Sequence, residues 1–175
     1  MKRTGDSLQL DGRHRRQADP ALPDRGLMIR EPWISQILMG RKTWELRGTS
    51  TRIRGRLALI RSGSGLIVGE CHLKDCIGPI DFDTLIETGA LSHEERDEIE
   101  HEGHAPYVAA DGVTSKTFAW IVSNPILYSR PVAYNHPSGA ITFVDLTKRG
   151  VIQCIEASSS TSRASQATSR QLQLL

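Results

Sequence analysis

The sequence predicts an α+β fold, a small β-barrel with flanking helices. Several short stretches alternate apolar and polar residues as strands do, one early stretch has the spacing of a helix, and an acidic helix is inserted later. The chain has 175 residues, which is enough for one domain with a hydrophobic core. We find no internal repeat and no second domain in the pattern.

The early helix is predicted at residues 33–38. Pro32 suits its first turn, because an N–H at that position would have no intrahelical partner. Apolar residues then recur at helical spacing, and Gly40 follows as a cap that can adopt a left-handed conformation. This helix is therefore expected to end just before the next strand.

That strand is predicted at residues 43–47, where Glu45 and Arg47 point to the same face. Lys42 lies in the joint between helix and strand. We expect Lys42, Glu45 and Arg47 to surround one small volume and to line a polar ligand cleft. The alternative is a solvated cluster of ion pairs, which contributes only ~0–1 kcal/mol per pair and has no function.

The remaining elements follow in order. Residues 57–60 form an apolar run typical of a strand buried on both faces, and Gly63 and Gly65 mark a hairpin turn to an alternating strand at 66–73. A short helix is predicted at 82–87. Further strands are expected at 118–122 and 141–146, the second closing the sheet.

A second, acidic helix is predicted to begin after Ser92. Glu95 stands three residues further on, which is the spacing of a capping box. The helix is expected to run to about Glu102, where Gly103 ends it.

Several motifs resemble those of the ASCH domain, a relative of the PUA RNA-binding fold. The resemblance begins with Leu27-Met28-Ile29-Arg30-Glu31-Pro32-Trp33 and with the run Gly40-x-Lys42-x-x-Glu45-x-Arg47. It continues through Arg54-Gly55, residues 57–60 and Val68-Gly69-Glu70-Cys71, and it ends at residues 136–144. It covers about residues 27–148, nearly all of the chain that has the composition of a folded domain.

The resemblance implies a PUA-like barrel with a basic cleft that binds RNA or a nucleotide-like ligand. It also implies an alternative, since some short members are amidohydrolases that act on N4-acetylcytidine. Lys42 matches their catalytic lysine, whereas Glu45 stands where they have threonine. Their later glutamate corresponds here to one of Glu98, Glu100 and Glu102.

Lys42 and Glu45 are the catalytic candidates if the protein is an enzyme. A neighbouring carboxylate favours the ammonium form of Lys42, which is opposite to what a general base needs. Trp33 is a candidate for stacking on a base or for anchoring the helix in the core. Candidate ligand contacts are Arg30, Trp33, Lys42, Glu45, Arg47, Arg52 and Arg54, with the arginines directed at phosphates.

Charge is distributed unevenly along the chain, although the formal net charge is only +2. Residues 41–61 carry a local charge of +6, and residues 81–102 carry a local charge of −8. A basic stretch matches a phosphate-bearing partner such as RNA, and the acidic helix is a candidate surface for a protein partner. In the alternative, the two stretches neutralise each other.

The two ends of the chain are predicted to be disordered. Residues 1–26 form a polar tail with a basic run, and residues 157–175 are rich in Ser and Thr. Neither end has a signal peptide or membrane span, so we expect a cytoplasmic protein. We expect no cofactor and no metal, because the spacing of Cys71, His72 and Cys76 does not suit a zinc site.

Overall fold

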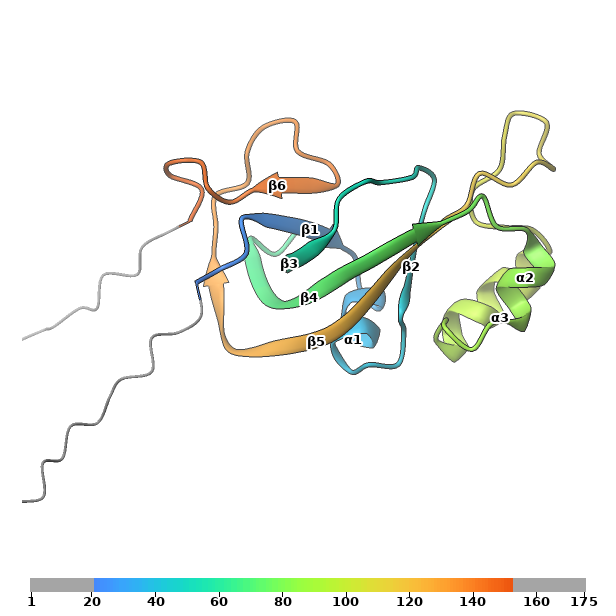
Figure 1. The fold of residues 1–175 in the computed structure, drawn as a ribbon, viewed down its shortest axis with the longest axis horizontal. Coiled ribbons are helices and arrows are strands. Elements are labelled where there is room, and N and C mark those ends of the chain that lie inside the picture. Colours follow the sequence, from blue (N-terminus) through green and yellow to red (C-terminus); the bar gives the residue numbers. More distant parts are fainter. Residues whose placement is uncertain (1–20, 153–175) are drawn as a thin grey trace, which may run out of the picture.

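A computed structural model describes residues 21–152 of the chain (Figure 1). In this range the strands are β1 (Arg25–Ile29), β2 (Trp44–Arg47), β3 (Gly55–Arg61), β4 (Leu66–Ile77), β5 (Phe118–Ala133) and β6 (Phe143–Asp145). The helices are α1 (Trp33–Leu38), α2 (Phe82–Glu87) and α3 (His93–Glu102). No helix in this range is long and apolar enough to cross a membrane.

The predicted tails lie mostly outside the described residues. The tail at 157–175 lies outside them entirely, as do residues 1–20 of the first tail. The strand β1 begins at Arg25, so the last two residues assigned to the first tail are part of the sheet. Gly26 pairs there with Ala58 of β3 and Val144 of β6.

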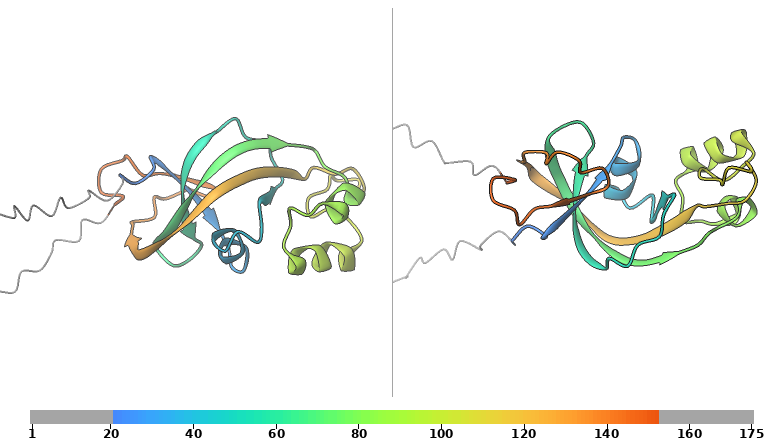
Figure 2. Two further views of the ribbon diagram at one scale, coloured as in Figure 1. Left: turned by 60° about the horizontal axis from the view of Figure 1, so that its bottom comes forward. Right: turned by 90° about the horizontal axis from the view of Figure 1, so that it is seen from above.

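The strands form one mixed sheet in the order β2-β5-β4-β3-β1-β6. β1 runs parallel to β3, and the other neighbouring strands are antiparallel. The sheet curls around the side on which α1 lies (Figure 2). Within the described part of the chain, however, β2 and β6 end the order and do not pair with each other. The predicted barrel is therefore corrected to a half-barrel, because edge strands of four and three residues leave the sheet open.

The predicted helices agree with the structure, with one correction at α3. The hydroxyl of Ser92 accepts a hydrogen bond from the backbone N–H of Glu95 at 3.3 Å, and Gly103 ends the helix with a φ of 72°. The capping box is only half formed, because the carboxylate of Glu95 accepts a hydrogen bond from Lys42 instead. This change of partner brings α3 into the site described below.

β5 is much longer than the strand predicted at 118–122. Pro125 and Pro131 interrupt the sequence pattern, since proline cannot donate to a strand ladder. β2 pairs only with residues 118–121 of β5. Beyond residue 121, β4 is the one neighbour of β5 among the described strands. Prolines are tolerated on such a free edge, and the bulges between β4 and β5 absorb the irregular register.

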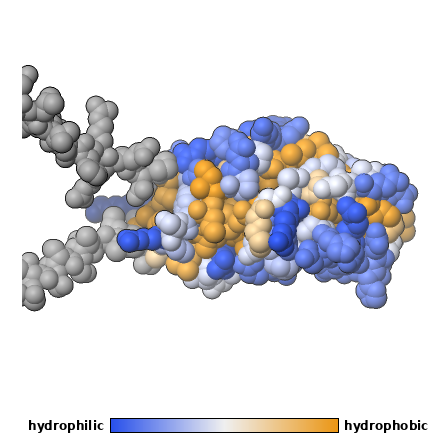
Figure 3. Space-filling view, turned by 90° about the horizontal axis from the view of Figure 1, so that it is seen from below, coloured by the Kyte–Doolittle hydropathy of each residue, from blue (hydrophilic) through white to orange (hydrophobic). Residues whose placement is uncertain are grey.

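Two separate apolar clusters position the site. The larger cluster lies between α1 and the sheet and includes Ile34, Ile37, Leu59 and Trp120. The second lies under α2 and α3 and joins residues of these helices to Leu46 of β2. The end of the molecule that carries α2 and α3 is mostly hydrophilic on the face shown in Figure 3.

Candidate functional site

The turn after α1 directs Lys42 into the protein. Gly40 has a φ of 71°, and the backbone N–H groups of Arg41 and Lys42 both donate to the carbonyl of Gln36, at 2.9 and 3.2 Å. This tight turn carries Lys42 inward just before β2 begins. Lys42 is 1% exposed, so the alternative of a solvated surface cluster is wrong for this residue.

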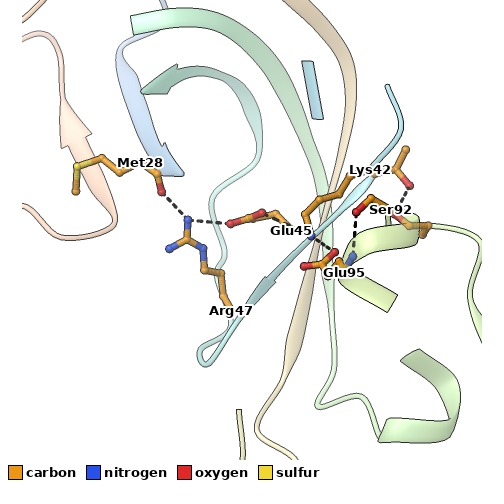
Figure 4. A network of polar contacts seen from close by, with 8 residues as sticks. Met28, Lys42, Glu45, Arg47, Ser92 and Glu95 are labelled. Atoms are coloured by element: carbon orange, nitrogen blue, oxygen red, sulfur yellow. Dashed lines mark hydrogen bonds and ion pairs between the residues drawn. The ribbon is translucent and has the colours of Figure 1, made fainter. Parts of the chain in front are cut away.

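Two carboxylates lie next to the ammonium group of Lys42 (Figure 4), and one aromatic ring lies near it. Its Nζ donates a hydrogen bond to Glu95 of α3 and lies 3.9 Å from Oε2 of Glu45 on β2. It also lies 5.5 Å from the centre of the Trp33 ring. Charges buried to this degree are stable only when they are paired.

Glu95, rather than one of the three predicted glutamates, is the carboxylate that α3 supplies to Lys42. Glu95 is 6% exposed, and burial raises its pKa above the usual range, although the ammonium of Lys42 partly offsets this effect. The sequence carried a signal for this placement, because Glu95 and Ile99 are four residues apart on one helix face. Ile99 is buried, so that face of α3 packs inward.

Glu45 and Arg47 lie on the same face of β2, as their alternation predicted. Nη2 of Arg47 lies 3.0 Å from Oε1 of Glu45 and donates to the backbone carbonyl of Met28 at 2.6 Å. The guanidinium also lies 5.6 Å from the centre of the Trp120 ring. Glu45 is therefore shared between the cations of Lys42 and Arg47, and β1, β2 and α3 are linked through one polar network.

A cavity of about 290 Å³ opens over this network. Its charged lining comprises Arg30, Arg47, Glu45, Glu95, Glu98 and Glu102. Trp33 and Tyr107 also line it, together with Met28, Leu46, Ser62, Ile99, Pro106 and Ile141. With Lys42 counted behind the wall, three cationic and four carboxylate side chains surround the cavity. The prediction of a basic cleft is therefore not met, since the formal charge around the cavity is −1.

The predicted arginine contacts divide into two groups. Arg30 and Arg47 line the cavity, but Arg54 lines a different hollow beside Arg25 and Arg56. Arg54 pairs with Asp75 at 2.7 Å, and Arg52 is exposed and is not part of either lining. Arg52 and Arg54 were assigned from their closeness in sequence to the motif, but the chain between β2 and β3 carries them away from it.

The basic stretch 41–61 is largely paired. Five of its seven cationic side chains make ion pairs, and their partners are Glu31, Glu45, Glu70, Asp75 and Glu95. Of these carboxylates only Glu95 belongs to the acidic stretch 81–102. The alternative, mutual neutralisation of the two stretches, therefore occurs at one position, and the other pairs are made with carboxylates elsewhere.

Tyr107 is a lining residue that the sequence did not indicate. It follows α3 in the connection to β5, and its ring packs on Gly48, where an added Cβ would lie 2.9 Å from Cδ1 of Tyr107. Tyr107 is 40% exposed. No local pattern marks it, because its position depends on the fold of the connection between β4 and β5.

The residues of the site offer no metal position. Within residues 21–152, no three His, Cys, Asp or Glu side chains come together in a way that could hold a metal ion. The chemistry available is that of carboxylate acceptors, the guanidinium groups of Arg30 and Arg47 and two aromatic rings.

The half-barrel sheet with three helices is a barrel-like, PUA-type α+β fold. The family model of the ASCH domain matches residues 27–129, and the chain belongs to the ASCH domain family, as its motifs predicted. Among solved structures it is similar to ASCH from Zymomonas mobilis, with 19% identity over 62% of this chain and 69% of that chain and a TM-score of 0.41. A tyrosine-to-phenylalanine mutant of ASCH from the same organism is 18% identical over 62% of this chain and 71% of that chain, again with a TM-score of 0.41. No curated protein matches the chain.

Proposed function

We propose that this ASCH domain binds a single nucleoside in the cavity over Lys42, Glu45 and Glu95. The observation that carries the proposal is which charged groups of the buried network line the cavity. The carboxylates of Glu45 and Glu95 line the cavity, whereas the side chain of Lys42 has no exposed surface and acts as their counter-ion. Carboxylate acceptors suit the amino and imino groups on the edge of an unpaired base.

The size and the charge of the cavity favour a nucleoside over an RNA strand. A volume of about 290 Å³ lies just below the range for small-molecule sites, which is ~300–1,000 Å³. Glu98 and Glu102 add negative charge to the wall that α3 forms, and this charge opposes a phosphate backbone. Trp33 and Tyr107 supply aromatic rings of the kind on which unpaired bases stack.

Calorimetric titration of the purified protein with adenosine, cytidine, guanosine and uridine tests the proposal. We expect the bases that carry an amino group to bind more tightly than uridine. Glu45→Gln should weaken their binding about tenfold or more, because a hydrogen bond to a charged group contributes roughly 1.5–3 kcal/mol.

Arg54→Ala is the matched control, since Arg54 lies outside the cavity, and it should leave the affinity unchanged. A short single-stranded oligonucleotide should bind no more tightly than its nucleosides. Tight oligonucleotide binding that falls steeply with salt, or equal binding by Glu45→Gln, would contradict the proposal.

The second candidate function is hydrolysis of an acylated cytidine, and one observation favours it. Glu95 combines a raised pKa with a direct hydrogen bond to Lys42, so it is a carboxyl group suited to proton transfer. In this role Glu95 would take the proton from a water that attacks the amide carbon. Lys42 would have to reach the resulting oxyanion, but its side chain is fully buried behind the two glutamates.

We expect little or no conversion of N4-acetylcytidine to cytidine by the purified protein. The buried position of Lys42 and the presence of Glu45 in place of threonine both work against this reaction. Chromatography of the incubated nucleoside measures the conversion. Turnover at ordinary enzymatic rates of about 1–10³ s⁻¹ that is lost in Glu95→Gln would establish the hydrolase instead.

A further inference from the structure

We propose that the preferred ligand of the cavity is a nucleoside whose base is positively charged at neutral pH, such as an adenine or cytosine methylated on a ring nitrogen. This inference rests on the proposed function, because it specifies which nucleoside the same cavity takes. It is carried by the placement of the cations, by one face of α3 and by the aromatic lining.

Of the three cations around the cavity, Lys42 and Arg47 already have partners, whereas Arg30 is an exposed residue of the lining. Lys42 is buried behind the wall, and the guanidinium of Arg47 is held by Glu45, by the carbonyl of Met28 and by the ring of Trp120. Glu45 and Glu95 line the cavity itself. A ligand in the cavity therefore meets four carboxylates, and Arg30 is the one lining cation that makes no ion pair within residues 21–152.

One face of α3 adds further negative charge to the same side. Glu95, Glu98 and Glu102 stand at positions i, i+3 and i+7 of the helix, and all three line the cavity. Among the ion pairs formed within residues 21–152, none involves Glu98 or Glu102. A cationic ligand would gain attraction from both, and a neutral base would not.

The aromatic lining also favours a cationic base. The Tyr107 ring packs against Gly48, and Tyr107 lines the cavity while 40% of the residue stays exposed. A positive charge over an aromatic face is attracted by the ring quadrupole, in addition to the stacking that any base obtains. Trp33 differs, because Lys42 lies over its ring. Tyr107 is therefore the ring to which we assign the cationic base.

The test compares isomers that differ in charge but not in composition. Calorimetry at pH 7 would measure 1-methyladenosine against N6-methyladenosine, and 3-methylcytidine against 5-methylcytidine. The first member of each pair is a cation and the second is neutral. Both carry one methyl group, so the contribution of that group to the affinity largely cancels in the comparison. We expect the cationic isomer to bind about tenfold more tightly in each pair, and added salt to reduce this preference.

Variants on α3 assign the preference to its carboxylates. The double variant Glu98→Gln/Glu102→Gln should remove most of the preference, because it weakens binding of the cationic isomers more than binding of the neutral ones. Glu100→Gln is the control, because Glu100 is an exposed residue of the same helix outside the lining. All three positions are exposed, so these variants should fold.

Three outcomes are distinguishable. Equal binding of the isomers would overturn this inference and leave the proposed function intact. Absence of binding by every nucleoside tested would overturn the proposed function itself. A preference that survives in Glu98→Gln/Glu102→Gln would overturn the assignment to α3.

Discussion

Replacement of Lys42 by methionine should lower the free energy of unfolding by about 3–5 kcal/mol. Methionine has a similar length, so the change removes the ammonium group without opening a large cavity. Glu95 then loses its hydrogen-bonded cation and Glu45 keeps only Arg47, while both carboxylates stay buried. Loss of one partner from a buried pair has a cost of this size because it leaves an uncompensated charge. Urea unfolding measures the difference.

Arg54→Met is the matched control, since it breaks the exposed pair with Asp75 and should leave the unfolding midpoint nearly unchanged.

The effect of Lys42→Met should also depend on pH. The pKa of Glu95 is raised in the folded protein, so its contribution to stability is present at low pH and is lost as the pH rises through the folded value. Without Lys42 this loss is larger. The variant should therefore approach the parent stability as the pH falls from 8 to 5, and a cost that is small or constant over this range would contradict the assigned role.

Gly69→Ala should be the most damaging change of a single methyl group in the sheet. A Cβ at Gly69 would lie 2.3 Å from the backbone oxygen of Ile126 and 2.6 Å from Cδ2 of Leu38. The oxygen belongs to the paired strand β5, so it cannot move away without disrupting the ladder. Overpacking of this kind typically costs about 1–3 kcal/mol, and we expect the upper end or beyond because backbone is involved.

Gly89→Ala is the control for the same chemical change. Nothing lies within 4 Å of the position that its Cβ would take, and its φ is not in the left-handed region. The variant should be neutral or slightly more stable, since alanine reduces the freedom of the unfolded chain. Thermal unfolding of the two variants side by side measures the contrast. Similar melting temperatures for the two would show that β4 and β5 can separate locally at Gly69.

The sequence predicted the local elements well because each depends on neighbouring residues. The helix at 33–38 follows from helical spacing between Pro32 and Gly40, and the cap at Ser92 follows from its own hydroxyl. Glu45 and Arg47 were placed on one face by strand alternation alone. Such features require no knowledge of what packs across the fold.

The features that the sequence did not predict depend on contacts between distant segments. Lys42 and Glu95 are 53 positions apart, and only the packing of α3 on β2 brings them together. Glu98, Glu100 and Glu102 carry the same charge as Glu95, so composition could not choose among them. The arginines of the basic stretch looked available in sequence, but their carboxylate partners come from several other parts of the chain. Closure of the sheet likewise depends on whether two edge strands meet.

The connection between β4 and β5 has a consequence for how this protein could change over generations. It carries α2 and α3 on an apolar cluster separate from the one under α1, and it also contributes one wall of the cavity. The other wall comes from β1, α1 and β2, whose packing belongs to the main sheet. Exposed substitutions along α3 can therefore alter which molecules the cavity accepts without disturbing the sheet. One exchangeable loop could adapt an unchanged scaffold to new ligands, as long as Glu95 remains to hold Lys42.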